Sequence, residues 1–318
     1  MFEDEPNLAD LDFEASVARG LTLRPRRFAS KWLYDDRGAA LFEDIVASDT
    51  YYVGRAELEI LEAHAHEIGE RIGDGGALVE LGSGASWKVR TLLDAMPDLA
   101  RYVPVEISEA QLIEAAAAIR SDYPALEVLP VAADYTRDFD LPAGVKDGPV
   151  LGSFLGTTLC NFLPANSEIF LQRMHGLLGE NSWFLAGVDL DKDPARLVEA
   201  YNDPGGPLWD FNLNILQRMN RELGTTLDQA DFRHEATWNA EHRRIEAAIY
   251  PMRDLSVTVA GQGFDLPAGE PIILEYSHKY SLEAFAALAA RAGWRSVTAW
   301  TDRDQLASIH LLTNRSAA

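Results

Sequence analysis

The feature that most constrains the fold is an apolar segment that leads directly into a glycine turn. Residues Ala77-Leu78-Val79-Glu80-Leu81 are followed at once by Gly82-Ser83-Gly84. A short apolar run of this kind is typical of a buried strand. Glycines at its end let the backbone turn sharply and pass close to a ligand, with the next helix beginning beside it. The turn therefore predicts a nucleotide-type ligand at the carboxyl end of a core strand.

Strand-like and helix-like segments alternate around that turn. Apolar residues with helical spacing predict helices over 58–72, 110–119, 167–178 and 282–292. Compact apolar or alternating runs predict strands over 77–80, 102–106, 126–131, 149–155, 182–188, 296–300 and 307–312. Such alternation is the signature of an α/β fold with a doubly wound parallel sheet, which is a Rossmann-like core.

Two stretches depart from this alternation. Residues 1–55 are polar and aromatic without strand–helix alternation, and we interpret them as an N-terminal cap. Residues 191–278 contain a helical pattern over 211–223 and then strand-like runs at 237–238, 244–250 and 255–259. We therefore expect a ligand-binding core made of 56–190 and 279–318, and a second, substrate-binding lobe made of 1–55 and 191–278.

Charge and cysteine content exclude several classes of function. With 28 basic and 50 acidic residues the formal net charge is -22, which repels nucleic-acid phosphates and anionic membranes. The lone Cys160 offers no internal disulfide, and the seven histidines show no ligand spacing, so we expect no metal site. No apolar run approaches membrane-spanning length. We expect a cytoplasmic monomer that acts on a small molecule.

Acidic residues near the turn narrow the choice of ligand. Glu106 ends the second predicted strand, 24 positions after Gly82, a spacing suited to hydrogen bonds from ribose hydroxyls. A dinucleotide fingerprint requires a sixth-position glycine, where this chain has Trp87, so a nicotinamide reductase is disfavoured. The carboxylate of Glu80 suits a cationic methionyl group, which favours S-adenosylmethionine (SAM).

Further residues could complete that site. Asp134-Tyr135 follow the third predicted strand, where a carboxylate could accept from an adenine amino group and a ring could stack on the base. Lys88 follows the turn and could meet a carboxylate of the ligand. A solvated loop aspartate and an ordinary surface lysine are the alternatives.

The chain resembles the L-histidine Nα-methyltransferases of the ergothioneine pathway from about Lys31 onward. The matching stretches are Lys31-Trp32-Leu33-Tyr34-Asp35, Ala40-Leu41-Phe42, Tyr51-Tyr52, Leu78 to Gly84, Leu155-Gly156-Thr157-Thr158-Leu159-Cys160-Asn161, Leu197 to Tyr201, Phe211-Asn212-Leu213-Asn214, Asn220 to Leu223, and Leu274-Glu275-Tyr276-Ser277-His278-Lys279. The resemblance implies a class I methyltransferase core with a separate substrate lobe, SAM as cofactor, and transfer of three methyl groups to the α-amino group of histidine, giving trimethylhistidine (hercynine).

The resemblance also implies roles for individual residues. The residues that it implies for the cofactor are Glu80, Gly82, Ser83, Gly84, Lys88, Glu106, Ile107, Asp134 and Tyr135. Those that it implies for the substrate are Tyr34, Phe42, Tyr51, Gly156, Asn161, Tyr201, Phe211, Ala247, Glu275, Tyr276 and Ser277, of which Tyr51 and Asn161 are the catalytic candidates.

The chemistry of these side chains agrees with such roles. Asn161 offers both a donor and an acceptor, which suits an α-amine beside a carboxylate, although asparagine also forms turns after strands. Tyr51 and Tyr201 can donate to a carboxylate or hold an ammonium group on their rings, although aromatic packing would equally explain them. Glu275 and Ser277 alternate along one strand, so both face one side, where they could bind an imidazole or be a solvated strand face.

Departures from the family leave the substrate open. Ala247 lies where bacterial histidine enzymes of the family carry methionine, which implies a roomier pocket, and Cys160 and Val53 replace a glycine and a proline. A related methyltransferase for another amino acid or amine is one alternative. A regulatory protein that binds SAM without catalysis is the other, and the presence of Tyr51, Asn161 and Glu275 argues against it.

Overall fold

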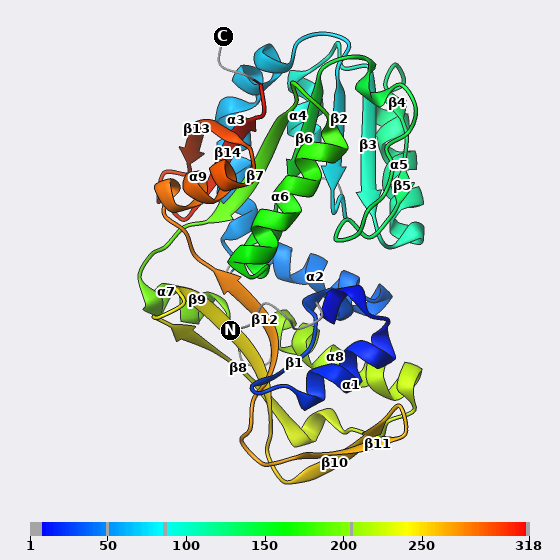
Figure 1. Cartoon of the computed structure of the whole chain (residues 1–318), viewed down its shortest axis with the longest axis vertical. Helices are drawn as coiled ribbons and strands as arrows, with labels where there is room; N and C mark the ends of the chain where they lie inside the picture. The colour runs from blue at the N-terminus through cyan, green and yellow to red at the C-terminus, as the bar shows by residue number, and fades with distance from the viewer. Residues whose placement is uncertain (1–7, 49–50, 85–87, 204–205, 316–318) are drawn as a thin grey trace. The chain divides into compact units, whose positions relative to one another are not determined.

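The computed structural model describes residues 8–48, 51–84, 88–203 and 206–315, which fold into two compact units (Figure 1). Unit 1 comprises Met1–Tyr51 and Lys192–His278, and unit 2 comprises Tyr52–Asp191 and Lys279–Ala318. The boundaries expected from the sequence lay at residues 55, 190 and 278. The first division precedes helix α3, Val53–Ile72, because that helix packs as one piece within unit 2.

Unit 2 is built on an eight-stranded sheet in the order β13-β14-β7-β6-β2-β3-β4, with β5 also paired to β3. Strands β4, β3, β2, β6 and β7 are parallel, whereas β14 and β13 are antiparallel. The central strands are buried on both faces, which explains their continuous apolar sequences. The strands are β2 Ala77–Leu81, β3 Arg101–Glu106, β4 Glu127–Val128, β5 Val131–Ala132, β6 Val150–Phe154, β7 Trp183–Asp189, β13 Arg295–Thr301 and β14 Ala307–Thr313.

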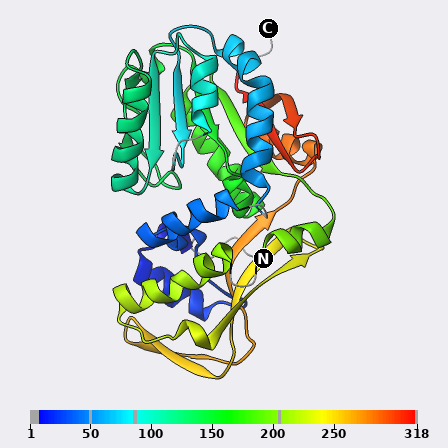
Figure 2. The same ribbon diagram turned by 180° about the vertical axis from the view of Figure 1, so that it is seen from behind.

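Helices cover both faces of this sheet. In Figure 1, α6 Pro164–Leu178 and α9 Leu282–Arg291 lie on the near face, and in Figure 2 helix α3 lies on the near side with α4 Val89–Ala95. Helix α5 is Glu109–Asp122, and short 3-10 turns are η3 Val145–Asp147 and η4 Thr158–Asn161. Each face encloses its own apolar core. This is the α/β, Rossmann-like arrangement that the sequence predicts.

One predicted strand is not continuous. The run over 126–131 was expected to be a single strand, but it forms β4 and β5 separated by Leu129-Pro130. Proline has no backbone N–H to donate to a neighbouring strand, so the pairing with β3 is interrupted there. The carboxyl end of the predicted strand is therefore the separate segment β5, which pairs with Val105 and Glu106.

Unit 1 combines a sheet with several helices. Its four-stranded sheet has the order β1-β12-β9-β8, and β10 and β11 form a separate hairpin. The strands are β1 Arg26–Arg27, β8 Phe232–Asn239, β9 Arg244–Pro251, β10 Leu255–Val259, β11 Gln262–Leu266 and β12 Ile272–His278. The helical elements are η1 Leu8–Asp10, α1 Phe13–Thr22, η2 Ser30–Leu33, α2 Asp36–Ala47, α7 Pro194–Ala200, α8 Pro207–Leu223 and η5 Gln229–Asp231.

The N-terminal segment is more regular than expected. It was interpreted as an N-terminal cap without strand–helix alternation, and it contains α1 and α2, each begun by an aspartate that accepts a backbone N–H of the first turn. Asp12 accepts from Ala15, and Asp35 accepts from Gly38. These two aspartates mark the starts of the helices in the sequence.

The described parts of the chain contain neither a candidate membrane span nor a cluster of metal-ligand side chains. None of the helices there is long and apolar enough to cross a membrane. Within the same residues, no three His, Cys, Asp or Glu side chains gather as metal ligands.

Candidate active site

The glycine turn lies at the carboxyl end of β2, where the sequence places it. Gly82 has a positive φ of 64°, and its N–H donates to the carbonyl of Val105 at 2.9 Å. A Cβ atom at Gly82 would lie 3.5 Å from the ring of Tyr135, so a larger side chain would fill the space over that ring. The turn thus keeps open a surface between backbone and aromatic ring. Trp87, used above against a nicotinamide ligand, lies outside the described residues.

Glu106 occupies the end of β3, next to the turn. One of its carboxylate oxygens accepts from Ile107 N at 2.8 Å, and the other faces Gly84 N at 3.3 Å. These contacts fix the carboxylate beside the glycines while its remaining lone pairs can accept other donors. Ile107 is half exposed, at 49%, so an apolar surface adjoins this carboxylate.

Glu80 lies beneath the turn and not at its surface. Its side chain is 7% exposed and accepts a hydrogen bond from the hydroxyl of Tyr102. Burial raises the pKa of the Glu80 carboxyl to about 7, an effect that the Tyr102 hydrogen bond and the nearby charge of Lys88 partly oppose. A cationic group brought near Glu80 would favour its ionised form.

Asp134 and Tyr135 follow β5 and have different environments. Asp134 Oδ1 accepts from both the backbone and the hydroxyl of Thr136, at 3.0 and 2.5 Å. The ring of Tyr135 packs edge-on against Phe154, with ring centroids 5.1 Å apart. Burial raises the pKa of the Tyr135 hydroxyl, so this tyrosine stays neutral in the usual pH range. Tyr135 therefore supplies an aromatic wall next to Gly82.

Lys88 is the residue immediately before α4. Its Nζ lies 2.5 Å from Oε2 of Glu57, a fully buried carboxylate of α3 that also accepts the N–H of Gly156 at 2.8 Å. Sequence reasoning missed Glu57. The signal was available, because Glu57 falls on the apolar stripe of α3 with Val53, Ile60 and Leu61 and is buried like them.

Asn161 ends η4, directly after the loop that contains Gly156. That loop begins at the carboxyl end of β6 and passes through Thr157, a buried residue with a positive φ of 56°. A threonine in this conformation is uncommon and indicates a backbone held by its surroundings. The predicted residues Lys88, Gly156 and Asn161 are thus brought to one end of the sheet of unit 2.

A buried polar group in unit 2 is centred on Asp189. Asp189, at the end of β7, accepts the hydroxyl of Tyr52 at 2.9 Å and pairs with Lys279 Nζ at 2.5 Å. The Asp189 N–H lies 3.4 Å from Sγ of Cys160. Both charged side chains are fully buried, so the pair depends on mutual neutralisation. None of these residues was predicted as part of a site, although the sequence shows that Asp189 and Lys279 each lie at the end of an apolar strand.

In unit 1, four of the predicted substrate residues form one aromatic cluster. The ring of Tyr34 contacts Phe42 and Phe211 at centroid distances of 5.4 and 5.2 Å, and Phe42 contacts Tyr51 at 6.1 Å. The contacts are mostly edge-to-face, the preferred geometry for aromatic pairs. Electron-rich ring faces of this kind can attract a cationic group.

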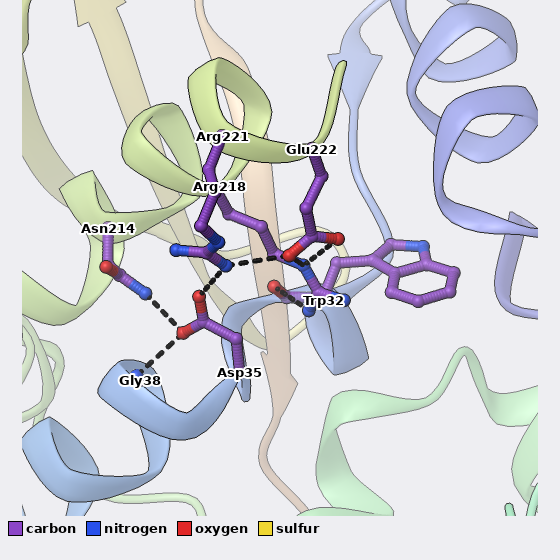
Figure 3. A network of polar contacts seen from close by, with 7 residues as sticks. All are labelled: Trp32, Asp35, Gly38, Asn214, Arg218, Arg221 and Glu222. Carbon is purple, nitrogen blue, oxygen red and sulfur yellow. Dashed lines mark hydrogen bonds and ion pairs between the residues drawn. The ribbon is translucent and has the colours of Figure 1, made fainter. Parts of the chain in front are cut away.

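Polar contacts hold this aromatic cluster together (Figure 3). Asp35 accepts from Asn214 at 2.7 Å and from Arg221 at 2.6 Å, both on α8, while it caps α2 through Gly38. Arg218 of α8 donates to the carbonyl of Trp32 at 2.9 Å. The hydrogen bonds and charge of Arg221 help to lower the pKa of the Asp35 carboxyl. The motif around Asp35 therefore joins the helices that carry Phe42 and Phe211.

All but one of the remaining substrate residues of unit 1 gather on one face of its sheet. The hydroxyls of Tyr201 and Ser277 are 2.8 Å apart, and Tyr201 and Ala247 pack in one apolar cluster. Glu275 lies opposite Ala247 across the β12–β9 pair, after an irregularity at Leu274, so Glu275 and Ser277 share a face. Tyr276 points to the other face, where Arg244 lies 3.6 Å from its ring centroid. The structure thus separates Tyr276 from Glu275 and Ser277.

The fold and the glycine turn define the class of the protein. The structure matches a SAM-dependent methyltransferase from Clostridium acetobutylicum with a TM-score of 0.51 over 88% of this chain and 99% of that one; at 11% identity this shows the fold alone. The space over Tyr135 and the carboxylates of Glu80 and Glu106 fit a cationic nucleoside ligand. The fold is that of the class I SAM-dependent methyltransferases, with an added antiparallel sheet.

Sequence comparison identifies the family. The model of the histidine-specific, SAM-dependent methyltransferases matches residues 13–314, and the chain belongs to that family. It is 38% identical to a histidine N-alpha-methyltransferase of Mycobacterium tuberculosis, over 94% of this chain and 93% of the relative. It is 39% identical to the protein of the same name from Mycolicibacterium smegmatis, over 90% of each chain. Ergothioneine biosynthesis protein 1 of Neurospora crassa is 32% identical over 91% of this chain, which spans 33% of that protein.

Proposed function

We propose that the protein transfers methyl groups from SAM to the α-amino group of L-histidine and forms trimethylhistidine for ergothioneine biosynthesis. The observation that carries this proposal is the cluster of Tyr201, Ser277 and Glu275 on one face of the unit 1 sheet. Its carboxylate and hydroxyls match an imidazole ring that must both donate and accept. The mycobacterial histidine N-alpha-methyltransferases support it by similarity over most of the chain.

Unit 2 is the proposed cofactor unit. Gly82 and the ring of Tyr135 border the nucleoside, and Glu106 accepts its ribose hydroxyls. Lys88 binds the carboxylate of the methionyl part, while Glu80 faces the cationic end. Asp134 accepts from the adenine amino group, in addition to its contacts with Thr136.

Unit 1 supplies the proposed substrate recognition. Glu275 and Ser277 bind the imidazole, and Tyr201 supports Ser277 through their hydroxyl contact. Tyr51 and the other rings of its aromatic cluster stabilise the ammonium group as methyl groups accumulate. Asn161, in unit 2, offers both a donor and an acceptor, which are the groups that an α-amine and a carboxylate require.

Alignment is the main contribution of these residues to the reaction. SAM supplies an electrophilic methyl group, and the neutral α-amine of the substrate displaces it in line. The ammonium group must lose a proton to solvent before it can react, and Tyr51 or water near Asn161 assists this loss without acting as a strong base. Turnover therefore increases with pH over the neutral-to-alkaline range. If Tyr51→Phe leaves all three methylation steps unchanged, its hydroxyl has no part in this proton loss.

The substrate is tested by a mass-spectrometric methylation assay with histidine, tryptophan, tyrosine and phenylalanine in parallel. Histidine should gain three methyl groups from SAM, and no product from any of the four would contradict the proposal. Glu275→Gln should raise the KM for histidine by about tenfold or more, because a charge-assisted hydrogen bond is lost. Glu235→Gln, on the sheet edge strand β8 in contact with Arg233, is the matched control and should leave KM unchanged.

Ala247 sharpens the same assay. It is 3% exposed and packs beside Tyr201, so its small side chain leaves room where a longer one would reach the substrate. Ala247→Met should therefore increase the preference for histidine over tryptophan. We further propose that the protein is a cytoplasmic monomer, which light scattering and cell fractionation test.

A further inference from the structure

The buried carboxylate of Glu57 joins two loops of unit 2 that carry predicted site residues. Its side chain is fully buried, and Oε2 lies 2.5 Å from Nζ of Lys88. Both of its oxygens lie 2.8 Å from the backbone nitrogen of Gly156. The Glu57 carboxylate thus contacts both Lys88, which follows the glycine turn in the sequence, and Gly156, in the loop before Asn161.

The surroundings of Glu57 accommodate this carboxylate and little else. A Cβ atom at Gly187 on β7 would lie 2.0 Å from Oε1, so the facing strand needs a glycine at that position. A buried ionised group is costly unless it is paired and hydrogen-bonded, and Glu57 has both kinds of partner. Val53, Ile60 and Leu61, on the same stripe of α3, are apolar, so an apolar residue would satisfy the packing of the helix. The carboxylate therefore has a role that packing alone does not explain.

The two contacts of Glu57 have different consequences. An ammonium has three donors, and the contact with Glu57 fixes the direction of one, which orients the others. The Gly156 contact holds the backbone just before Thr157, the residue with φ of 56° that begins the turn to Asn161. The carboxylate therefore restrains both a cofactor-binding lysine and the loop that carries a substrate-binding asparagine.

We infer that Glu57 is a positioning residue for methyl transfer. It orients Lys88 toward the carboxylate of the cofactor's methionyl part, and through Gly156 it sets the position of Asn161. The part of this inference that concerns Asn161 rests on the proposed function. The part that concerns Lys88 and the cofactor, which we call the cofactor arm, does not depend on histidine being the substrate.

Two ligands separate this role from a purely structural one. S-adenosylhomocysteine carries the methionyl carboxylate, and 5′-methylthioadenosine lacks it. Calorimetric titration of Glu57→Gln should show S-adenosylhomocysteine binding weakened by about tenfold, as for loss of a charge-assisted contact, with 5′-methylthioadenosine binding unchanged. The glutamine is neutral, and in either orientation its NH2 group faces the N–H of Gly156, because both Glu57 oxygens lie 2.8 Å from that nitrogen. In one of the two orientations the NH2 group also faces Lys88. An equal loss for both ligands, or none for either, overturns the inference.

A double-mutant cycle with Lys88→Met tests whether Glu57 acts through the lysine. In the Lys88→Met background, Glu57→Gln should change S-adenosylhomocysteine affinity little, because their effects are coupled. Additive losses contradict the inference. Glu59→Gln is the matched control, since Glu59 lies on the same helix and pairs with Arg303. Should Glu57→Gln not fold, Gly187→Ala displaces the same carboxylate and should weaken S-adenosylhomocysteine selectively.

Kinetic measurements test the part of the inference that concerns Asn161. Glu57→Gln should also lower kcat for histidine at saturating SAM, because the loop before Asn161 is no longer held, and an unchanged kcat would overturn this part. If the wild-type protein does not methylate histidine while Glu57→Gln still weakens S-adenosylhomocysteine selectively, the proposed function fails and the cofactor arm of the inference holds.

Discussion

The two units organise their predicted site residues in different ways. In unit 2 the polar residues lie at the carboxyl ends of parallel strands, where the topology of the sheet brings them together. In unit 1 they come from α2, α8, the end of α7 and β12, segments far apart in the sequence. The ion pairs of the two units also differ in exposure. Asp189 and Lys279 of unit 2 are fully buried, whereas Arg221 of unit 1, which pairs with Asp35, is 52% exposed. The predicted site residues of unit 2 are therefore held by buried polar contacts, whereas those of unit 1 are held by helix capping and aromatic packing.

The largest effect should follow from breaking the buried ion pair of unit 2. Lys279→Met removes the cation and leaves the carboxylate of Asp189 buried with the Tyr52 hydroxyl as a neutral donor. The free energy of unfolding should fall by about 3–5 kcal/mol, measured by urea denaturation. A loss as small as that of an exposed pair would show that water reaches this site.

The next effect is a loss of stability in acid that originates in His310. This histidine of β14 packs against Phe285 at 4.7 Å, and burial lowers its pKa to about 4. The unfolded chain binds its proton near pH 6.5, so stability is complete above that value and falls as the pH drops toward 4. The loss should reach roughly 3 kcal/mol, from about 1.4 kcal/mol per pKa unit.

Comparison with a variant isolates this contribution, because Glu80 titrates in a neighbouring range. His310→Phe removes the titrating group, so the difference in unfolding free energy between wild type and variant should depend on pH only below about 6.5. A constant difference between pH 7.5 and 4.5 would show that the pKa of His310 is the same in the folded and the unfolded chain.

A smaller and more specific effect is expected for Tyr201 of unit 1. Tyr201→Phe keeps the ring and removes the hydroxyl that contacts Ser277 at 2.8 Å. The KM for histidine should rise by about tenfold, equivalent to one hydrogen bond, while the affinity for S-adenosylhomocysteine stays unchanged. Equal changes in both constants would remove the division of labour between the units.

The smallest effect should come from the capping network in Figure 3. Asp35→Ala removes the cap of α2 and the contacts with Asn214 and Arg221. The free energy of unfolding should fall by about 1–2 kcal/mol, because an N-cap contributes about 1 kcal/mol and a partly exposed ion pair adds little. Asp36→Ala, one residue further into the same helix, is the control and should cost less.

The core of unit 2 was predictable because its signals are local. Buried parallel strands are continuously apolar, the helices between them have one apolar stripe, and glycines mark the turn after β2. Pro130 broke the expected strand over 126–131, and only the pairing with β3 showed where it resumes. The helices α1 and α2 were not predicted, although each has an apolar stripe and Asp12 and Asp35 mark their starts.

The residues at the site divide in the same way. Gly82 and Glu106 followed from strand ends and spacing, whereas the aromatic cluster and the Tyr201–Ser277 pair required a family resemblance, since no local pattern connects Tyr34 with Phe211 or Tyr201 with Ser277. Neither the local sequence patterns nor the family resemblance predicted Glu57 or Asp189. A charged residue on an apolar stripe shows that a partner is needed, but not which one.

The sequence by itself determined the class of fold, the glycine turn and the family of this protein, because these depend on residue patterns that are short or shared with relatives. Only the tertiary structure decided which distant groups meet. The contacts of Glu57 with Lys88 and Gly156, and of Asp35 with Arg221, join residues separated by dozens of positions or more. Such contacts depend on the packing of whole helices and strands, and chain order alone does not specify that packing.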